Sequence, residues 1–167
     1  MAKTILHLGS NLGDRQANLL QAIAHLNDLT GSIIQQSSFF ETAAWGVEDQ
    51  PSFFNIALIC QTNLSPDQLL KSVLEIERLM GRERKKRWGV RLIDIDILFY
   101  NDWRITYPDL IIPHPSIQDR NFVLQPLLEI APNLLHPVLK KTIKELAAQC
   151  EDSLLVKLIP KSSVIPY

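Results

Sequence analysis

The chain has 167 residues, of which 46% are hydrophobic and 21% are charged, so we expect residues 1–167 to form a single globular domain with its own core. Its formal net charge of −1 argues against a protein held on nucleic acid by its overall field, because such binding needs many cationic contacts with phosphates. No apolar run approaches the roughly 20 residues of a membrane span, and the two distant cysteines indicate neither a disulfide framework nor a zinc site, so we expect a cytoplasmic monomer with no membrane partner.

The first part of the chain predicts strands that flank a helix. An apolar run at residues 3–8 predicts a strand that enters a turn at residues 9–13. We interpret this glycine-containing segment as a structural turn, because it lacks the lysine and the spacing of a phosphate-binding loop. A helix with apolar residues at helical spacing should follow and end near Gly31. Two further strands are expected at residues 33–40 and 54–61.

The clearest predicted element is a helix that begins after Ser65. Ser65 is a typical N-cap, Pro66 suits the first helical position, and Gln68 completes a capping box. Apolar residues then recur at helical spacing as far as Gly81, which we expect to end the helix. The segment that follows, residues 82–87, is too highly charged to pack in a core.

The second half of the chain predicts another strand, two helices and an extended end. The strand is expected at residues 92–100, and a short helix at 122–130 is expected to be interrupted at Pro126. Thr142 begins a second capping box, and the tail from residue 156 should be extended. Strands that alternate with helices predict an α+β fold with a mixed, mainly antiparallel sheet flanked by helices.

Two aspartates on one predicted strand carry most of the functional information. Strict alternation between residues 92 and 98 places Asp94 and Asp96 on one face of the strand and three isoleucines on the other. Like charges on one strand face repel, so this arrangement calls for a compensating cation. Carboxylate oxygens suit Mg²⁺, and such a pair could hold two Mg²⁺ ions against phosphate oxygens. The alternative for an isolated pair is an ordinary solvated strand face.

A basic segment comes directly before the two aspartates. Seven of the 17 Lys and Arg residues of the chain lie between Arg78 and Arg91. Guanidinium groups bind phosphates bidentately and stabilise charge on a transferring phosphoryl group. The combination of an acidic pair and a basic loop therefore indicates Mg-nucleotide chemistry, although the basic run alone would also fit a solvated loop or a nucleic-acid patch.

Several other side chains are candidates for contacts with a flat ligand. Trp88 lies within the basic segment, where it could stack on a base or serve as a loop hinge. Phe53, Asn55 and Ala57 share one strand face, which suits a flat heterocycle but also fits simple core packing. His114, between two prolines, could reach a phosphate or ribose, or could be structural.

Taken together, these blocks resemble the 6-hydroxymethyl-7,8-dihydropterin pyrophosphokinase family. The resemblance covers about residues 3–150. It is most specific where Arg-Trp-Gly-x-Arg at residues 87–91 leads into Asp-x-Asp at residues 94–96. The other matching blocks lie at residues 9–11, 49–51, 53–55, 81–82, 113–115, 120–124 and 126–132.

The resemblance implies a ferredoxin-like α/β sandwich and an enzyme of folate biosynthesis that transfers diphosphate from ATP to the hydroxymethyl group of a reduced pterin, releasing AMP. By the same resemblance, Asp94 and Asp96 would be catalytic and would bind two Mg²⁺ ions. Arg82 and Arg91 would be catalytic by engaging the ATP phosphates during transfer. Further ATP contacts would come from Arg84, Lys85, Trp88, Ile97, His114 and Arg120, and pterin contacts from Thr42, Ala43, Trp45, Phe53, Asn55, Trp88, Asp94 and Phe122.

Two other functions fit part of the pattern. A nucleotidyltransferase also pairs a Gly-Ser turn with Asp-x-Asp on a strand, but those features are close in sequence, whereas here they lie at residues 9–10 and 94–96. An RNA-binding module on a ferredoxin-like sheet would explain the basic loop and the aromatic residues. It would not explain two carboxylates where phosphates would lie, and the aromatic sheet motif of such modules is missing from the sequence.

Overall fold

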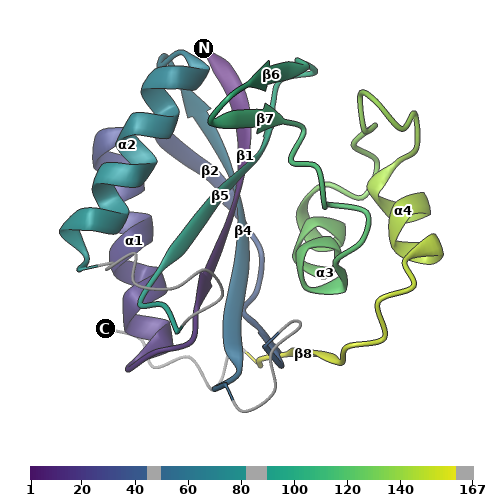
Figure 1. Ribbon diagram of the computed structural model, residues 1–167, viewed down its shortest axis with the longest axis horizontal. Coiled ribbons are helices and arrows are strands. Elements are labelled where there is room, and N and C mark those ends of the chain that lie inside the picture. The colour runs from purple at the N-terminus through teal and green to yellow at the C-terminus, as the bar shows by residue number, and fades with distance from the viewer. Residues whose placement is uncertain (45–49, 82–89, 161–167) are drawn as a thin grey trace.

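The computed structural model describes residues 1–44, 50–81 and 90–160 (Figure 1). The first elements are β1 (Ala2–Ser10), α1 (Arg15–Leu29), β2 (Ser32–Gln36), β3 (Phe40–Thr42), β4 (Phe53–Thr62) and α2 (Pro66–Leu79). They are followed by β5 (Asp94–Tyr100), β6 (Ile105–Tyr107), β7 (Leu110–Ile112), α3 (Asn121–Ile130), α4 (Ile143–Gln149) and β8 (Val156–Leu158).

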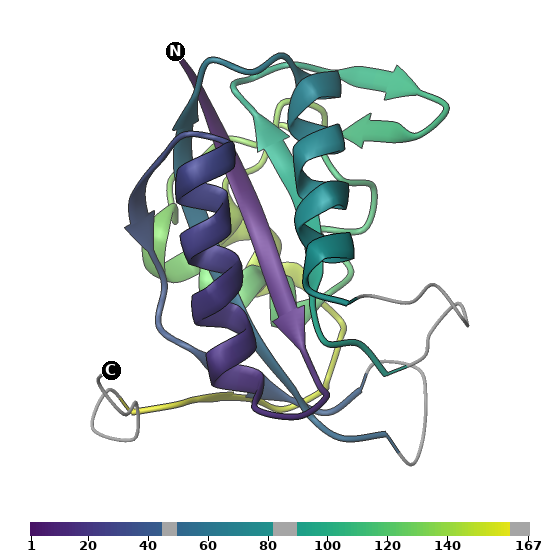
Figure 2. The same ribbon diagram turned by 90° about the vertical axis from the view of Figure 1, so that its left-hand side faces the viewer.

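The main sheet has six strands in the order β5-β1-β4-β3-β8, and β2 also pairs with β4. Each pairing between described strands is antiparallel. Helices α1 and α2 cover one face of this sheet, and α3 and α4 cover the other (Figures 1 and 2). The expected α+β sandwich with a mainly antiparallel sheet is therefore confirmed, and no parallel pair occurs among the described strands. None of the described helices combines the length and the apolarity needed to cross a membrane.

The sheet separates two buried apolar clusters, as expected for strands that are covered on both faces. On β1, Leu6 and Leu8 join the cluster formed with α1 and α2, whereas Ile5 joins the cluster formed with α3 and α4. Ile95 and Ile97 of β5 also point to the α1/α2 side. The alternate residues of β1, β4 and β5 therefore face α3, and this is the side on which the polar residues gather.

Local sequence signals account for three of the helix starts. Asp14 caps α1 by accepting a hydrogen bond from an N–H in the first turn. Ser65 and Thr142 each form the predicted capping box, at the starts of α2 and α4. The described part of the tail, residues 156–160, is extended as expected, and its strand β8 pairs with β3.

Two predicted elements differ from the structure. The single strand expected at residues 33–40 is divided into β2 and β3, because Ser37 leaves the regular ladder. Its Oγ accepts the Ala57 N–H at 3.0 Å, while its own N–H donates to the Ala57 carbonyl at 2.9 Å. The predicted interruption at Pro126 is wrong, because α3 continues through this residue. The small β6–β7 hairpin was not predicted, because each of its strands has only three residues.

Candidate active site

The register of three neighbouring strands brings the polar residues together. Gly9 of β1 lies opposite Asn55 of β4 on one side and Asp94 of β5 on the other. One step along β1, His7 lies opposite Asp96. Because directly opposite residues point to the same face of a sheet, these residues form two adjacent rows on the face that α3 covers. Because residues alternate between the two faces of β5, both aspartates lie on this face, beside Gly9 and His7 of β1.

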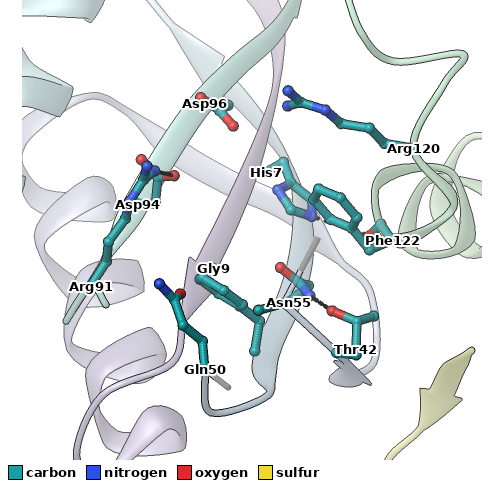
Figure 3. A pocket seen from close by; sticks show the side chains of 13 residues that line it. His7, Gly9, Thr42, Gln50, Asn55, Arg91, Asp94, Asp96, Arg120 and Phe122 are labelled. Atoms are coloured by element: carbon teal, nitrogen blue, oxygen red, sulfur yellow. Dashed lines mark hydrogen bonds and ion pairs between the residues drawn. The ribbon is translucent and has the colours of Figure 1, made fainter. Parts of the chain in front are cut away.

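A pocket lies over these rows, between the sheet and the first turn of α3 (Figure 3). In Figure 3, the carboxylates on β5 lie on one side of the pocket, and Arg120 and Phe122 reach in from α3 on the other side. The pocket is lined by His7, Gly9, Thr42, Ala43, Ala44, Gln50, Phe53, Asn55, Arg91, Asp94, Asp96, Arg120 and Phe122.

Gly9 leaves room for a ligand on the pocket floor. A Cβ atom at this position would lie 3.0 Å from Asn55 Oδ1 and 3.5 Å from Cδ1 of Phe53. A side chain here would therefore press on the amide of Asn55 and would make ordinary van der Waals contact with the ring of Phe53. The interpretation of residues 9–13 as a purely structural turn needs correction, because Gly9 belongs to β1 and lines the pocket.

The amide of Asn55 is held in a fixed orientation at one wall of the pocket. Its Nδ2 donates a hydrogen bond of 2.8 Å to Thr42 Oγ1, and both residues are buried. Phe53 projects from the same strand two residues earlier and provides an apolar surface beside the amide. An oriented amide next to an aromatic ring can recognise a flat, hydrogen-bonding heterocycle.

His7 fixes the opposite wall through the irregularity in α3. Pro126 has no N–H with which to bond the carbonyl of Phe122, four residues earlier. The Nε2 of His7 lies 3.3 Å from that carbonyl, and because a carbonyl can only accept, His7 donates. Burial lowers the pKa of His7 to about 4, so the ring is neutral at pH 7. The side chain of His7, on β1, thereby anchors the turn of α3 that carries Phe122.

The two carboxylates lie in different electrostatic surroundings. Asp94 forms an ion pair with Arg91, and both side chains are 24% exposed. Burial, followed by the negative charge of Asp94, raises the pKa of Asp96 to about 7. A cation bound between the two carboxylates would offset the cost of burying the Asp96 charge and the repulsion between Asp94 and Asp96.

The donor set fits Mg²⁺ that is shared with a phosphate ligand. Among the described residues, no group of three or more His, Cys, Asp or Glu side chains could enclose a metal ion. Mg²⁺ is commonly held by only one or two carboxylates, with its other positions filled by water and substrate phosphates. The oxygens of Asp94 and Asp96 supply such a partial site.

A second hollow runs along the outer edge of β5, between α2 and the segment around β7. Asp94 and Asp96 line this hollow as well as the pocket. The two carboxylates therefore lie where the two spaces meet. The other residues that line the second hollow are Leu70, Leu74, Glu77, Ile95, Ile97, Pro108, Asp109, Leu110, Ile111, His114 and Pro115.

Asn11 connects the chain segments that lead into β4 and β5. Its Oδ1 accepts the Arg91 N–H at 2.7 Å, and its own N–H donates to the Arg91 carbonyl at 3.1 Å. Its Nδ2 donates to the Pro51 carbonyl at 3.3 Å. A buried asparagine in the turn after β1 thus fixes the backbone beside the carboxylates relative to the entry of β4.

A polar network holds together the two ends of the segment between β3 and β4. Arg15 Nη1 donates to Glu41 Oε1 at 2.9 Å and to Ser52 Oγ at 2.6 Å. Ser52 Oγ in turn donates to Glu41 Oε1 at 2.7 Å, and the Arg15 guanidinium lies 3.8 Å from the centre of the Phe54 ring. The start of α1 therefore holds both ends of the segment that contributes Ala43, Ala44 and Gln50 to the pocket.

The structure brings together most of the residues that the sequence selected. Ile97 and His114 line the second hollow, beside the two aspartates. Ala44, which also lines the pocket, lies within residues 42–45, whose backbone the family resemblance places at the pterin edge. Sequence reasoning assigned no ligand contact to His7, Gly9 or Gln50, although alternation along β1 could have indicated the first two. Trp45, Arg82, Arg84, Lys85 and Trp88 lie outside the described residues. The selected residues that line the pocket are Thr42, Ala43, Phe53, Asn55, Arg91, Asp94, Asp96, Arg120 and Phe122.

Comparison with known proteins gives consistent matches. Residues 5–132 match the model of the family described as 7,8-dihydro-6-hydroxymethylpterin-pyrophosphokinase. An Aquifex aeolicus protein named 2-amino-4-hydroxy-6-hydroxymethyldihydropteridine pyrophosphokinase is 43% identical over 145 residues, which cover 87% of this chain and 90% of the relative. A Methylorubrum extorquens protein of the same name is 40% identical over 154 residues, covering 92% of this chain and 96% of the relative.

Solved structures show the same fold at low sequence identity. The wild-type Plasmodium falciparum HPPK-DHPS with pteroate superposes with a TM-score of 0.73 at 21% identity. The match covers 89% of this chain but only 42% of that larger chain, so this chain spans less than half of it.

Proposed function

Because this chain belongs to the 7,8-dihydro-6-hydroxymethylpterin-pyrophosphokinase family, we propose that it transfers diphosphate from ATP to the hydroxymethyl group of 6-hydroxymethyl-7,8-dihydropterin in a Mg²⁺-dependent reaction. As a member of the family it is an enzyme, a pyrophosphokinase of folate biosynthesis that uses ATP and a pterin. The products of the proposed reaction are AMP and the pterin diphosphate.

One observation carries the proposal: Asp94 and Asp96 line both the pocket and the hollow along β5. A transfer between two substrates requires their reacting groups to meet within a few ångströms in a fixed orientation. Two spaces that share a pair of carboxylates provide such a meeting point. The pocket would hold the pterin, and the hollow would hold the nucleotide.

The pocket suits the pterin because it combines aromatic surfaces with an oriented amide. The pterin ring lies between Phe53 and Phe122 in this proposal, and Gly9 supplies the space beneath it. Asn55, fixed by Thr42, reads the hydrogen-bonding edge of the ring. The hydroxymethyl group then points toward Asp94.

The hollow along β5 suits ATP. Leu70 and Leu74 of α2 offer apolar contacts to the base, and the outer edge of β5 at Ile97 offers backbone groups. His114 lies farther along the same hollow, and Arg120 approaches the carboxylates from α3 (Figure 3). The basic residues Arg82, Arg84 and Lys85 and the indole of Trp88 remain predictions from the sequence.

The carboxylates of Asp94 and Asp96 would hold two Mg²⁺ ions. Bound Mg²⁺ neutralises phosphate oxygens and polarises the phosphorus that is attacked. Asp96 is suited to this role because burial beside Asp94 makes its charge costly without a cation. Arg91 exchanges its bond with Asp94 for bonds with the ATP phosphates when the nucleotide enters.

In the transfer step, the hydroxymethyl oxygen of the pterin attacks the β-phosphorus of ATP. A new oxygen–phosphorus bond forms, the bond between the β-phosphorus and the oxygen that bridges it to the α-phosphate breaks, and AMP leaves with that oxygen. The hydroxyl proton is released to water. Arg91 and the sequence-predicted Arg82 stabilise the charge that develops on the phosphates, an interaction that favours the transition state over the bound substrates.

The test is to incubate the protein with ATP, Mg²⁺ and 6-hydroxymethyl-7,8-dihydropterin and to separate the products. We expect equal amounts of AMP and pterin diphosphate, with no product after chelation of the metal. Asp28→Asn, an exposed position on α1 on the far face of the sheet, serves as the matched control for Asp96→Asn. Formation of ADP and pterin monophosphate, or full turnover by Asp96→Asn, would contradict the proposal.

A further inference from the structure

The first turn of α3 carries Arg120 and Phe122 but is capped from a distant part of the chain. In the described structure, the N-cap residue Arg120 does not cap this helix with its own side chain. Instead, the Asn121 N–H donates a 2.9 Å hydrogen bond to Oδ2 of Asp152. The negative charge of Asp152 also lies at the positive end of the helix dipole, where an anion is favoured. The tail after α4 thus completes the start of α3.

We propose that residues 151–159, which we term the tail strap, set the distance between two walls of the substrate pocket, and that Asp152 is the positioning residue of this strap. The strap runs from the first turn of α3 to the edge of the main sheet. Figure 1 shows the chain leaving α4, passing below α3 and reaching β8.

The attachment to α3 uses more than one bond. Asn121 Nδ2 donates to the Leu154 carbonyl at 3.3 Å, and the Leu154 N–H donates to Oδ1 of Asp152 at 3.1 Å. Both oxygens of Asp152 are therefore engaged, one with α3 and one within the strap. This arrangement fixes the turn of the strap at the same time as it caps the helix.

The attachment to the sheet is a short antiparallel ladder. Val156 pairs with Thr42 of β3, and Leu158 pairs with Phe40. The ladder is extended by a 2.9 Å hydrogen bond from the Ile159 N–H to the Phe39 carbonyl. The strap is consequently paired, within the same sheet, with the strand that supplies Thr42 to the pocket.

Thr42 and Phe122 belong to different walls of the pocket, and the strap is attached to the backbone of both walls. A pocket for a flat ring depends on the spacing of its walls, because dispersion contacts weaken over gaps of less than 1 Å. Residues 5–132 make up the match to the family model, so the strap lies beyond it. The identity of the ligand as a pterin rests on the proposed function.

Asp152→Ala tests this role. We expect the dissociation constant for 6-hydroxymethyl-7,8-dihydropterin to rise about five-fold, the effect expected from loss of a helix cap. Amide hydrogen exchange should accelerate in residues 121–125 and remain unchanged in α1. Asp152→Asn keeps one acceptor oxygen but loses the second acceptor and the charge, so it should recover both properties only in part. Glu151→Ala, at the exposed neighbouring residue, should resemble the wild type in both.

The outcomes separate this proposal from the proposed function. If the wild-type protein does not bind the pterin, the proposed function fails, and the exchange data alone decide whether Asp152 caps α3. If the wild type binds and Asp152→Ala binds equally well, the strap does not position the walls. Loss of exchange protection throughout the protein, rather than in residues 121–125, would also overturn the proposal, because Asp152 would then serve general stability.

Discussion

Arg91 and Asp94 form an ion pair at the place where the pocket meets the hollow along β5. The backbone of Arg91 is fixed by Asn11, so only its side chain needs to move for the pair to open. The pair keeps the guanidinium of Arg91 beside the carboxylates before a nucleotide binds. It also places a protein cation in competition with any metal ion for Asp94.

Replacing Arg91 with alanine should therefore separate metal binding from catalysis. We expect Arg91→Ala to bind Mn²⁺ several-fold more tightly in the absence of nucleotide, because a competing positive charge is gone. Its kcat should fall by about 100-fold or more, because a cation that acts on the developing charge is lost. Calorimetric titration and steady-state kinetics measure the two effects, with Arg104→Ala as the control. Weaker Mn²⁺ binding in Arg91→Ala would show that the ion pair does not compete with the metal.

Asp96→Asn should lose activity and gain stability. The folded-state pKa of Asp96 is raised to about 7, above its ordinary value of 3.8, so at pH 8 the folded protein bears the full cost of a buried charge. Without divalent cations, we expect the variant to be more stable at pH 8 by more than about 1 kcal/mol. The gain should fall to a small remainder at pH 4, where the carboxyl is protonated in the folded state and about half protonated in the unfolded state. Turnover should fall at least about 100-fold. Urea unfolding at pH 8 and pH 4 checks the first effect; an unstabilised variant would mean that the site tolerates the charge.

Gly9→Ala should weaken pterin binding selectively. The new methyl group would lie 3.0 Å from Asn55 Oδ1 and would displace the amide that faces the ligand. We expect the KM for the pterin to rise about ten-fold or more, while the KM for ATP stays within about two-fold. Circular dichroism should show an intact fold. An equal rise in both KM values would indicate a distorted sheet.

Glu41→Gln should reduce stability in a pH-dependent manner. Hydrogen bonds from Ser52 and then Arg15 hold the pKa of Glu41 below its ordinary value of 4.5. Such a group stabilises the folded state above its unfolded-state pKa, and this contribution is lost as the pH falls through the folded-state pKa. We expect Glu41→Gln to be less stable by about 0.5–1 kcal/mol at pH 7, and we expect this difference to shrink as the pH falls below 4.5 toward 3. Urea midpoints at the two pH values provide the measurement; a constant difference would exclude the ionised network as its source.

The parts of the fold that depend on local rules could be predicted from the sequence. Alternation placed Asp94 and Asp96 on one strand face, and the capping boxes at Ser65 and Thr142 marked helix starts, because each of these signals lies within a few neighbouring residues. The contribution of His7 could not be predicted in this way, since it depends on the pairing of β1 with β5 and on the position of α3.

The division of residues 33–40 and the continuity of α3 also depend on distant contacts. Ser37 leaves the ladder because its hydroxyl meets the backbone of β4, which is far away in sequence. Propensity alone favours a break in a helix at Pro126, but the packing of Val123 and Leu127 against the sheet outweighs that local preference. Contacts between residues far apart in sequence therefore decided both outcomes, a hydrogen bond at Ser37 and apolar packing at α3.

The carbonyl that Pro126 leaves without a helical partner makes residues 7 and 126 energetically interdependent, although they lie in different elements. A residue with an N–H at position 126 would satisfy this carbonyl within α3, and the imidazole of His7 would then become a buried polar group in need of another partner. Substitutions at the two positions should consequently be non-additive in a double-mutant cycle. The hydrogen bond that Pro126 cannot make within α3 is thus replaced by one that connects β1 of the sheet to the turn carrying Phe122.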